Sequence, residues 1–254
     1  MNLDLTGKQV LITGGCGEIG AQMARAFLLE GSLVMLLDTD TAIAKSTDRL
    51  HRLSRIGAGT LSTVACDITD NDALSQLPER ISSLVNTVDV LINNAGINRL
   101  AAATAVTESL WDEILNVNLK GAFFISKTVA DFMITGGGGS IINISSQHGL
   151  VGNYDRAPYC ASKGGMVNLT RALCLEWANY NIRVNCLCPT YVLHEKSKDQ
   201  LMQPAFYRSY IREIPLRKYC TPQDIASAAL FLASSVSGMI TGQCLAIDGG
   251  YLAH

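Results

Sequence analysis

The chain has 254 residues, of which 48% are hydrophobic and 17% charged, and its formal net charge is -2. This length suits one α/β domain with a large core, and the balance of residues argues against disorder. The small negative charge offers nothing for nucleic acid to bind, and no apolar run approaches the ~18 residues of a membrane span. The N-terminal start also lacks the basic and apolar parts of a secretory signal. We therefore expect a cytoplasmic protein with neither nucleic-acid nor membrane partners.

Seven short segments rich in β-formers alternate with longer helical patterns. They cover residues 9–13, 33–37, 60–65, 88–92, 140–144, 182–187 and 244–247. Uninterrupted apolar runs such as residues 33–37 suit strands that helices cover on both faces. The sequence therefore predicts an α/β fold with a Rossmann-type, doubly wound, seven-stranded parallel sheet. We expect residues 1–254 to form a single domain, because we see neither a linker nor an internal repeat.

A glycine-rich turn follows the first strand segment. Gly14, Gly17 and Gly20 stand in the run Thr-Gly-Gly-Cys-Gly-Glu-Ile-Gly, which ends this segment and opens a helical pattern. In that setting glycines let a pyrophosphate approach the backbone amides at a helix N-terminus. A glycine-rich turn alone is equally compatible with a tight turn that binds nothing.

Asp38 adds the second half of a dinucleotide fingerprint. It follows the second strand segment, eighteen residues after Gly20, where a carboxylate can bind both hydroxyls of an adenosine ribose. A 2′-phosphate would meet this negative charge, and neither Cys16 nor Thr39 supplies a compensating cation. The sequence therefore predicts NAD as the cofactor; the alternative is an ordinary acid at a strand end.

Tyr159 and Lys163 stand four residues apart in the helical pattern 159–177, so their side chains share one helix face. A free tyrosine has a pKa near ~10, and an ammonium beside it favours the phenolate. The pair is thus suited to exchange a proton with an alcohol or a carbonyl. The alternative is a solvated pair in which the lysine methylenes cover the ring.

The cysteines are scattered along the chain without the paired spacing of a zinc site. We expect free and mostly buried thiols in a reducing compartment, and no metal site. The eight cysteines stand at positions 16, 66, 160, 174, 186, 188, 220 and 244.

Further motifs follow along the chain. They are Cys66-Asp67-Ile68, Asn93-Asn94-Ala95-Gly96, Asn118 in Asn-Val-Asn-Leu-Lys, Ser146 in Asn-Ile-Ser-Ser-Gln-His-Gly, Ile240-Thr-Gly-Gln243 and Asp248-Gly-Gly250. Together with the glycine turn and Tyr159 and Lys163, they make the chain resemble a single-domain short-chain dehydrogenase/reductase from Thr13 to Gly250. The cofactor contacts that this resemblance implies are Gly14, Gly17, Glu18, Ile19, Asp38, Asp67, Ile68, Asn94, Ala95, Gly96, Tyr159, Lys163, Pro189 and Val192.

The resemblance also implies a catalytic set of Asn118, Ser146, Tyr159 and Lys163. Tyr159 removes or returns a hydroxyl proton while the nicotinamide exchanges hydride with the same carbon. Lys163 lowers the phenol pKa and holds the nicotinamide ribose, Ser146 orients the reacting oxygen, and Asn118 positions a water. Ser146 fits the family spacing, thirteen residues before Tyr159, whereas Ser145 is expected to support the strand end.

Three positions depart from the family pattern. Glu18 stands where a middle glycine is usual, so the glycine spacing resembles the family's extended branch. We expect its carboxylate to turn to solvent, because it would repel a pyrophosphate. Thr190 replaces a usual glycine, and His194 replaces a threonine that contacts the cofactor. His194 then faces the cofactor, the substrate or the solvent.

The segment before Tyr159 is rich in hydrogen-bonding side chains: Gln147, His148, Asn153, Tyr154 and Arg156. Such a pocket suits a sugar, polyol or sugar acid better than a sterol or fatty-acyl chain, although a solvated loop would carry the same residues. The polar segment 193–217 is the expected lid. The expected substrate contacts are Ser146, Gln147, His148, Asn153, Tyr159 and His194.

The main functional hypothesis is an NAD-dependent oxidoreductase that acts on a secondary alcohol or hemiacetal. A 3-oxoacyl thioester or other carbonyl reductase would use the same catalytic set, although Asp38 argues against NADPH. A non-catalytic NAD(H)-binding protein is the remaining alternative. Family members usually form tetramers through long helices and the C-terminal strand, so the resemblance implies a homotetramer that uses the helix ending near Trp177 and the tail 249–254.

Overall fold

The computed structural model describes residues 3–253. The predicted domain 1–254 and the predicted tail 249–254 also include Met1, Asn2 and His254, which lie outside the described residues. Within this range seven strands form one sheet in which all neighbouring strands are parallel, in the order β3-β2-β1-β4-β5-β6-β7. The predicted doubly wound sheet is confirmed. The strands are β1 (Gln9–Thr13), β2 (Leu33–Asp38), β3 (Thr60–Ala65), β4 (Val90–Asn93), β5 (Gly139–Ile144), β6 (Ile182–Pro189) and β7 (Cys244–Ile247).

The fourth strand begins later than predicted. A strand from residue 88 is wrong, because β4 starts at Val90. Val88 is nevertheless buried, and the Asp89 carboxylate accepts a hydrogen bond from the backbone of β1 at 2.8 Å. Val88 is thus apolar because it is buried, and not because it belongs to the strand. β2 and β6 extend beyond their predicted ends and carry Asp38 and Pro189 to the carboxyl edge of the sheet.

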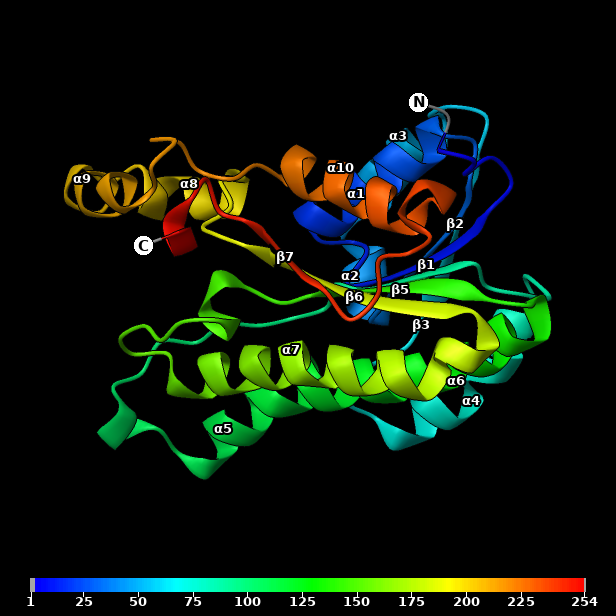
Figure 1. Cartoon of the computed structure of the whole chain (residues 1–254), viewed down its shortest axis with the longest axis horizontal. Coiled ribbons are helices and arrows are strands. Elements are labelled where there is room, and N and C mark those ends of the chain that lie inside the picture. The colour runs from blue at the N-terminus through cyan, green and yellow to red at the C-terminus, as the bar shows by residue number, and fades with distance from the viewer. Residues whose placement is uncertain (1–2, 254) are drawn as a thin grey trace.

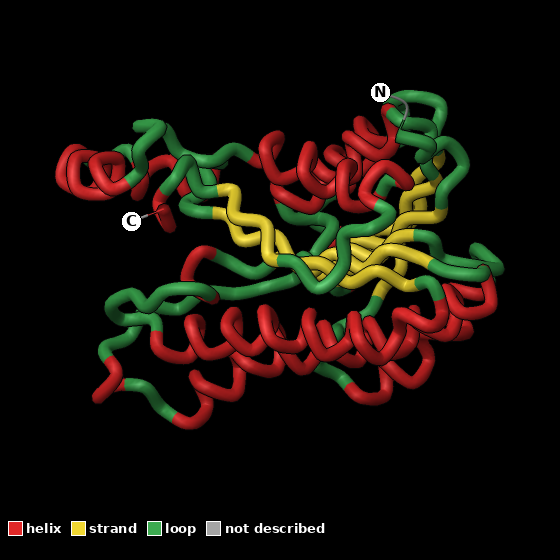
Figure 2. Tube along the Cα trace, in the orientation of Figure 1, coloured by secondary structure: helices red, strands yellow, loops and turns green. Residues whose placement is uncertain are grey.

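Helices cover both faces of the sheet (Figure 1). One face carries α1 (Glu18–Leu29), α3 (Thr47–Leu53) and α10 (Pro222–Ala233), and the other carries α4 (Asn71–Ser82), α5 (Glu108–Leu115), α6 (Ala122–Gly136) and α7 (Ala157–Trp177). The short α2 (Asp40–Ala44) follows β2, while α8 (Glu195–Leu201) and α9 (Pro204–Glu213) follow β6. Figure 2 shows the strands enclosed between the two helical layers. None of the described helices is long and apolar enough to cross a membrane.

Alternate side chains of the central strands pack into two cores. Val10 and Ile12 of β1 lie in the core with α1 and α10, whereas Leu11 lies in the core with α4, α6 and α7. Successive strand residues point to opposite faces, so a strand covered on both faces needs an apolar residue at every position. This requirement explains the uninterrupted apolar runs of the sequence.

The strand order creates a crevice at one edge of the sheet. β1 pairs with both β2 and β4, so the connections that follow β1 and β4 leave in opposite directions. In doubly wound sheets, ligands bind at this switch point, outside the carboxyl ends of the strands. The expected lid segment 193–217 contains α8 and α9, which lie beside this edge (Figure 1). They pack around a small core of their own formed by Leu201, Ile211, Ile214 and Tyr219.

Candidate active site

Two adjoining cavities open at the carboxyl edge of the sheet. The larger one, here called the glycine-turn cleft, has a volume of about 820 Å³ and is lined by the turn 14–20, the end of β2 and residues 66–69. The smaller one, the tyrosine pocket, has about 340 Å³ and is lined by residues 144–148, by Tyr159 and Lys163, and by the segment after β6. Because the two cavities share lining residues, they are parts of one site. The shared residues are Ile19, Asn94, Gly96, Ile97 and His194.

The glycine turn lies against the sheet where side chains would not fit. Gly14 has a φ of +61°, and a Cβ on it would lie 2.8 Å from the Ala95 Cα. A Cβ on Gly20 would lie 2.5 Å from the Gly14 oxygen. Asn94 fixes the turn, since its Nδ2 donates to the carbonyl oxygens of Thr13 and Gly14 at 3.0 and 3.1 Å. The turn therefore presents backbone at the start of α1, as a pyrophosphate site requires.

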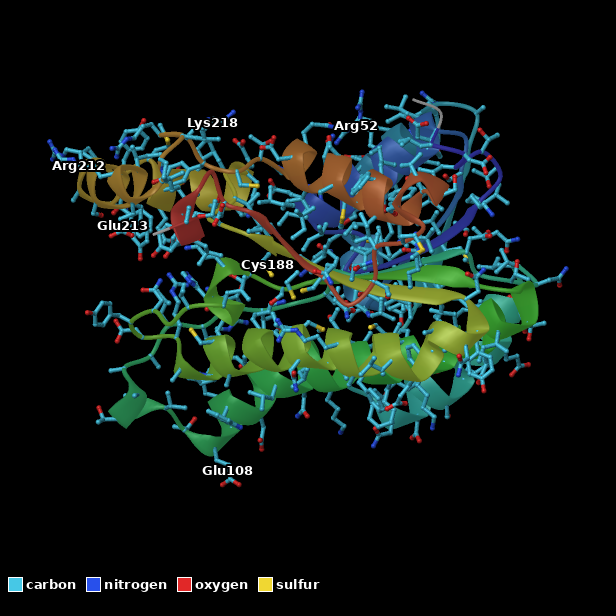
Figure 3. All side chains as sticks on the ribbon, viewed as in Figure 1. Arg52, Glu108, Cys188, Arg212, Glu213 and Lys218 are labelled. Atoms are coloured by element: carbon cyan, nitrogen blue, oxygen red, sulfur yellow. The ribbon has the colours of Figure 1, made fainter. Side chains whose placement is uncertain are left out.

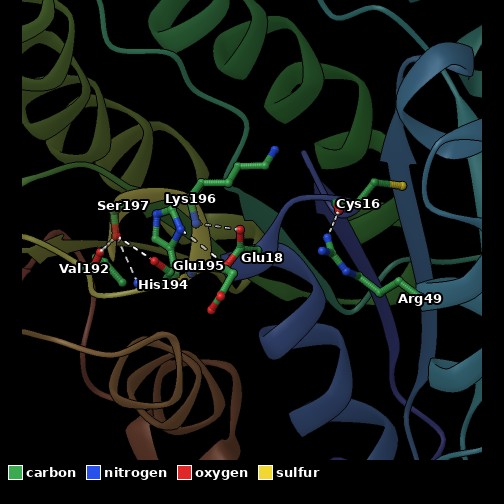
Figure 4. Close-up of polar contacts among 8 residues, drawn as sticks. All are labelled: Cys16, Glu18, Arg49, Val192, His194, Glu195, Lys196 and Ser197. Atoms are coloured by element: carbon green, nitrogen blue, oxygen red, sulfur yellow. Dashed lines mark hydrogen bonds and ion pairs between the residues drawn. The ribbon is translucent and has the colours of Figure 1, made fainter. Parts of the chain in front are cut away.

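Asp38 lies in the cleft at the end of β2, held by two backbone amides. Its carboxylate oxygens accept hydrogen bonds from Cys16 N at 3.0 Å and Thr39 N at 2.9 Å. This fixes the carboxylate where an adenosine ribose would follow a pyrophosphate bound at the turn. Sequence reasoning missed three cations that line the same cleft, Lys45, Arg49 and Lys196. Arg49 donates to the Cys16 carbonyl at 2.5 Å (Figure 4), and only the packing of α3 against α1 brings it there.

The residues expected to contact a cofactor all line these cavities. Those of the cleft are Gly14, Gly17, Glu18, Ile19, Asp38, Asp67, Ile68, Asn94, Ala95 and Gly96, and those of the pocket are Tyr159, Lys163, Pro189 and Val192. Gly96 lies where the two cavities meet. A Cβ there would lie 3.3 Å from Asn118 Oδ1 and 3.4 Å from Lys163 Nζ. The absence of a side chain at Gly96 therefore leaves room for a ligand that spans both cavities.

The expectation that Glu18 turns to solvent is wrong. Its carboxylate accepts hydrogen bonds from Glu195 N at 2.7 Å and Lys196 N at 3.3 Å, and one oxygen lies 3.4 Å from His194 Nδ1 (Figure 4). Burial alone would raise the pKa of Glu18, but the two amides and the histidine hold it below its usual value. The free amides of a first helical turn attract a carboxylate. Glu18 thus ties the start of α1 to the start of α8.

Tyr159 and Lys163 lie in the first turns of α7, which confirms the predicted helix. The Lys163 side chain is buried, and its Nζ donates to the Ile144 carbonyl at the end of β5 at 2.8 Å. The same nitrogen lies 5.9 Å from the centre of the Tyr159 ring. The spacing of four residues therefore brings the phenol and the ammonium to one wall of the pocket.

The electrostatics of this pair differ from expectation. Burial raises the pKa of Tyr159, and the Ser146 hydroxyl offsets this only in part. Burial also lowers the pKa of Lys163 to about 8, opposed by the thiols of Cys186 and Cys188. The expected lowering of the phenol pKa by Lys163 is not seen, because burial dominates at the phenol and the ammonium is engaged by a backbone carbonyl.

The two adjacent serines have different partners. Ser145 Oγ donates to the Lys163 carbonyl at 2.9 Å and so joins β5 to α7. Ser146 Oγ accepts a hydrogen bond from His148 N at 3.2 Å at the start of η3 (Gln147–Gly149), and its hydroxyl interacts with the Tyr159 phenol. Ser146 is therefore the serine placed to share a reacting oxygen with the tyrosine.

Asn118 lies in a π-helical turn, η2 (Asn116–Gly121), and is fully buried. Its Oδ1 accepts from Ile97 N at 2.8 Å, while its Nδ2 donates to the Ile97 carbonyl and to Ser162 Oγ, both at 3.0 Å. Asn118 thereby joins the segment after β4 to α7 beside the tyrosine pocket. Single π-turns of this kind frequently mark functional sites. Its expected role in positioning a water stays a prediction.

Gln147 and His148 are buried in the wall of the tyrosine pocket with polar atoms left unpaired. Both polar atoms of Gln147, Nδ1 of His148 and Oγ1 of Thr190 have no hydrogen-bond partner among residues 3–253. Burial, helped by the charge of Arg156, lowers the pKa of His148 to about 4, so its ring is neutral at pH 7. A buried polar group without a partner costs about 1–3 kcal/mol. A ligand rich in hydroxyl groups would supply the missing partners.

Two residues of the expected substrate pocket lie elsewhere. Tyr154 is 89% exposed, so the solvated-loop alternative holds for it. Asn153 is absent from the described lining of the pocket, because its Nδ2 lies 3.0 Å from His148 Nε2 and 3.1 Å from the Tyr191 hydroxyl. The lining of the cavity therefore does not support a direct substrate contact of Asn153, which stays a prediction. The Asn153 amide instead contacts Nε2 of His148 and so positions the His148 ring.

Arg156 places a buried cation beside the tyrosine. It is 8% exposed, lines the pocket together with Ser146 and Tyr159, and lies 5.8 Å over the centre of the Tyr191 ring. The ion pairs of the described residues do not include it. A buried charge is stable only when a partner compensates it. An anionic group of a ligand would find that compensation here.

The two cavities thus suit the two halves of one reaction. The cleft offers backbone amides at a helix start and a fixed carboxylate at the end of β2, which fit a dinucleotide, and Gly96 leaves it open to the pocket. The pocket brings a phenol and a serine hydroxyl to a polar ligand. A tyrosine that exchanges protons next to a dinucleotide is the chemistry of an NAD(P)-type oxidoreductase.

Comparison with known proteins narrows this class. The family described as "Enoyl-(Acyl carrier protein) reductase" matches residues 16–252, and short-chain dehydrogenases match along nearly the whole chain. The protein belongs to the short-chain dehydrogenase/reductase family, as its motifs predicted.

Its relatives carry names from three substrate classes. A 3-oxoacyl-(acyl-carrier-protein) reductase of Thermotoga maritima is 36% identical over 97% of this chain and 98% of its own. Galactitol 2-dehydrogenase (L-tagatose-forming) of Cereibacter sphaeroides is 34% identical over 97% of this chain and 96% of its own. The crystal structure of a gluconate 5-dehydrogenase from Burkholderia cenocepacia in complex with NADP and tartrate is 31% identical, covers 100% of this chain and 98% of that chain, and has a TM-score of 0.91. The protein is thus an alcohol dehydrogenase or carbonyl reductase of this family.

Proposed function

We propose that the protein transfers hydride between NAD and a secondary alcohol or hemiacetal of a sugar acid, sugar or polyol, with a sugar acid as the preferred substrate. The observation that carries this proposal is Arg156, a buried cation that forms no ion pair with residues 3–253 and lies in the wall that also holds Ser146 and Tyr159. The unpaired polar atoms of Gln147 and His148 support a substrate with several hydroxyl groups. A site built to hydrogen-bond hydroxyls discriminates strongly against ligands that lack them.

Tyr159 and Ser146 have different roles in the proposed reaction. A bound nicotinamide supplies the hydride acceptor or donor. In the oxidation direction the Tyr159 phenolate takes the hydroxyl proton, and Ser146 Oγ holds the same oxygen. Lys163 lies on the same wall, with its Nζ 5.9 Å from the centre of the Tyr159 ring. Because burial raises the pKa of Tyr159, the phenol stays protonated near neutral pH and the phenolate forms only in more alkaline solution. Alcohol oxidation should therefore become faster in alkaline solution, whereas carbonyl reduction, which needs the phenol, should be favoured near neutral pH.

The preference for NAD rests on Asp38. Its carboxylate is held by two amides at the ribose end of the cleft, where it would bind two hydroxyls and repel a 2′-phosphate. Arg49 is the opposing feature, because a guanidinium in the same cleft attracts a phosphate. We expect the fixed carboxylate to dominate, so that NAD is used better than NADP.

Reduction of a 3-oxoacyl thioester is the second candidate, supported by the 36% identity to such a reductase. An acyl chain would leave the charge of Arg156 and the amide of Gln147 without partners, which favours the sugar acid. A non-catalytic NAD(H)-binding protein is the third candidate.

A substrate panel separates these candidates. The formation or loss of NADH and NADPH absorbance should be followed with sugar acids, sugars, polyols and a 3-oxoacyl thioester, each with both cofactors. We expect the highest kcat/KM for a sugar acid with NAD. The highest value for the thioester would contradict the substrate proposal, and a tenfold preference for NADP would contradict the cofactor proposal. NADH binding without turnover of any substrate would favour the non-catalytic protein.

Three further parts of the proposal concern the whole molecule. The segment 193–217 acts as a lid over the tyrosine pocket, and the protein works in the cytoplasm. It assembles as a homotetramer. Exposed apolar side chains on α7 and near β7 support this assembly: Leu175, Met239 and Leu245. Light scattering at micromolar concentration tests this assembly, and a monomer mass would contradict it.

A further inference from the structure

Three thiols gather behind the tyrosine pocket, and the proposed reaction does not use them. Cys186 and Cys188 belong to β6 and Cys244 to β7, and Cys186 and Cys244 are partners in the strand register. Residues two apart on a strand point to the same face, and Figure 3 places Cys188 between the sheet and α7. The three sulfur atoms lie within 4.8 Å of one another, and those of Cys186 and Cys188 are 3.9 Å apart. All three are free thiols.

We propose that Cys186, Cys188 and Cys244 form a three-thiolate binding site for a soft, closed-shell metal ion, namely Cu(I). Thiolate ligands select Cu(I) and zinc over harder ions. With a metal–sulfur bond of about 2.3 Å, three sulfurs in one plane around the ion lie about 4.0 Å apart. The observed sulfur triangle therefore needs to contract by less than about 1 Å.

The number of ligands favours Cu(I) over zinc. Structural zinc is bound by four ligands in a tetrahedron. In the described part of the chain no fourth His, Cys, Asp or Glu joins the three sulfurs. Cys186 and Cys188 are fully buried, so water has little access to a fourth position. A site of two buried cysteines and one partly buried cysteine, without a fourth ligand, suits an ion that accepts three-fold thiolate coordination.

The surroundings compensate the charge that binding would create. On binding, the three thiols release three protons to solvent and bind one Cu(I), which leaves a net charge of -2 without any electron transfer. Val167 of α7 packs against the thiols, with Lys163 one turn before it and Arg171 one turn after it. Lys163 acts electrostatically on Cys186 and Cys188, and Arg171 on Cys244. Two cations thus flank the site, as a buried anionic complex requires.

The site also has a route from solvent. β7 is the edge strand of the sheet, and Cys244 is only partly buried. The sequence gives no sign of the site, because Cys186 and Cys188 are separated by one residue rather than two and Cys244 is distant in the chain. Only the pairing of β6 with β7 unites them.

An anaerobic titration of the full chain with Cu(I) against a competing chelator tests the proposal. We expect one Cu(I) per chain and three sulfur ligands at about 2.3 Å in the X-ray absorption spectrum. Cys244→Ala should weaken binding at least about 100-fold, since even the partners behind metal ligands are worth 10–100-fold. The matched control is Cys174→Ala, which removes a buried thiol of α7 outside the cluster and should keep native affinity.

Circular dichroism establishes that the variants fold, and Cys244→Ser replaces the alanine variant if that one does not. The proposal is overturned if native protein binds no Cu(I) against the chelator, or if Cys244→Ala and Cys244→Ser bind it as tightly as native protein. It is equally overturned if the absorption spectrum shows two sulfur ligands. Because this readout requires neither NAD nor substrate, it is independent of the proposed oxidoreductase activity.

Discussion

The glycine-turn cleft and the tyrosine pocket differ in whether their polar side chains have partners within the chain. In the cleft, Asp38 and Glu18 are each held by two backbone amides of the same chain. In the pocket, Gln147 and His148 are buried with polar atoms that have no hydrogen-bond partner among the described residues, and the buried Arg156 belongs to none of their ion pairs. The two carboxylates of the cleft are therefore satisfied before any ligand binds, while the pocket keeps unpaired groups that a ligand would satisfy. We infer that the cleft binds the cofactor and that the unpaired groups of the pocket select the substrate.

The largest expected effect follows from removal of the proposed proton carrier of the pocket, Tyr159. Tyr159→Phe should lower kcat by about 10²–10⁴-fold, the usual worth of a general acid or base, and leave NADH binding unchanged because the cleft is intact. Turnover of the preferred substrate and fluorescence titration with NADH measure the two quantities. Tyr154→Phe is the matched control, since that tyrosine is 89% exposed and should have native kinetics. Retained turnover in Tyr159→Phe would remove the tyrosine from the mechanism.

The second effect concerns a pocket residue that is buried in its neutral form. The pKa of His148 is about 4 in the folded chain and 6.5 in its ordinary state. Between these values the unfolded chain binds the proton and the folded chain does not, so lowering the pH favours unfolding. The free energy of unfolding should fall by about 2 kcal/mol between pH 7 and pH 5 through this residue.

Urea unfolding at the two pH values measures this loss. His148→Gln should lose less stability than native protein over the same interval, because it cannot take up the proton. His51→Gln, which replaces an exposed histidine, should behave like native protein. An equal pH dependence in native protein and His148→Gln would show that His148 is not buried as a neutral ring.

The third effect tests the contact between the cleft and the lid. Glu18→Gln keeps the shape of the side chain but removes the charge that accepts from the amides of Glu195 and Lys196. Hydrogen bonds to charged groups contribute about 1.5–3 kcal/mol, so exchange of these amides should accelerate about tenfold or more. Hydrogen–deuterium exchange of the peptide that begins α8 measures it. Glu30→Gln, at the other end of α1, should leave that exchange unchanged, and equal exchange in both variants would show that Glu18 does not hold α8.

The smallest effect concerns cofactor choice within the cleft. Arg49→Ala should lower kcat/KM for NADP about five- to tenfold and change that for NAD by less than about twofold, because only the 2′-phosphate adds a charge near the guanidinium. Arg52→Ala, on the exposed side of the same helix α3 (labelled in Figure 3), should change neither value. An equal loss for NAD and NADP would assign Arg49 a purely structural role.

Local patterns predicted the cleft better than the pocket. The glycine turn and Asp38 are encoded within one strand–turn–helix–strand unit, so their placement follows from adjacent residues. Arg49 reaches the same cleft from α3, and Glu18 meets the lid 177 residues later in the chain. Contacts of that kind depend on how helices pack, and residue spacing does not report them.

The pocket shows the same limit at shorter range. Five polar residues precede Tyr159, and their hydrogen-bonding character predicted that they line the pocket, with a solvated loop as the alternative. The structure places Tyr154 in solvent and Asn153 behind His148, because the loop before α7 turns these two side chains away from the cavity. Likewise, the sequence did not predict the cluster of three thiols, because only the pairing of β6 with β7 brings them together. Polar composition thus indicated the kind of pocket but not which side chains face it.

One measurement tests the claim that the pocket is completed by an anionic, hydroxyl-rich substrate. It is the ratio of kcat/KM for an aldonate to that for the alditol of the same carbon skeleton, determined with NAD for native protein and for Arg156→Met. The account predicts a ratio of about 100 in native protein, reduced to a few-fold in Arg156→Met, since a buried charge pair is worth several kcal/mol. A native ratio below one, or the same ratio in both proteins, would contradict it.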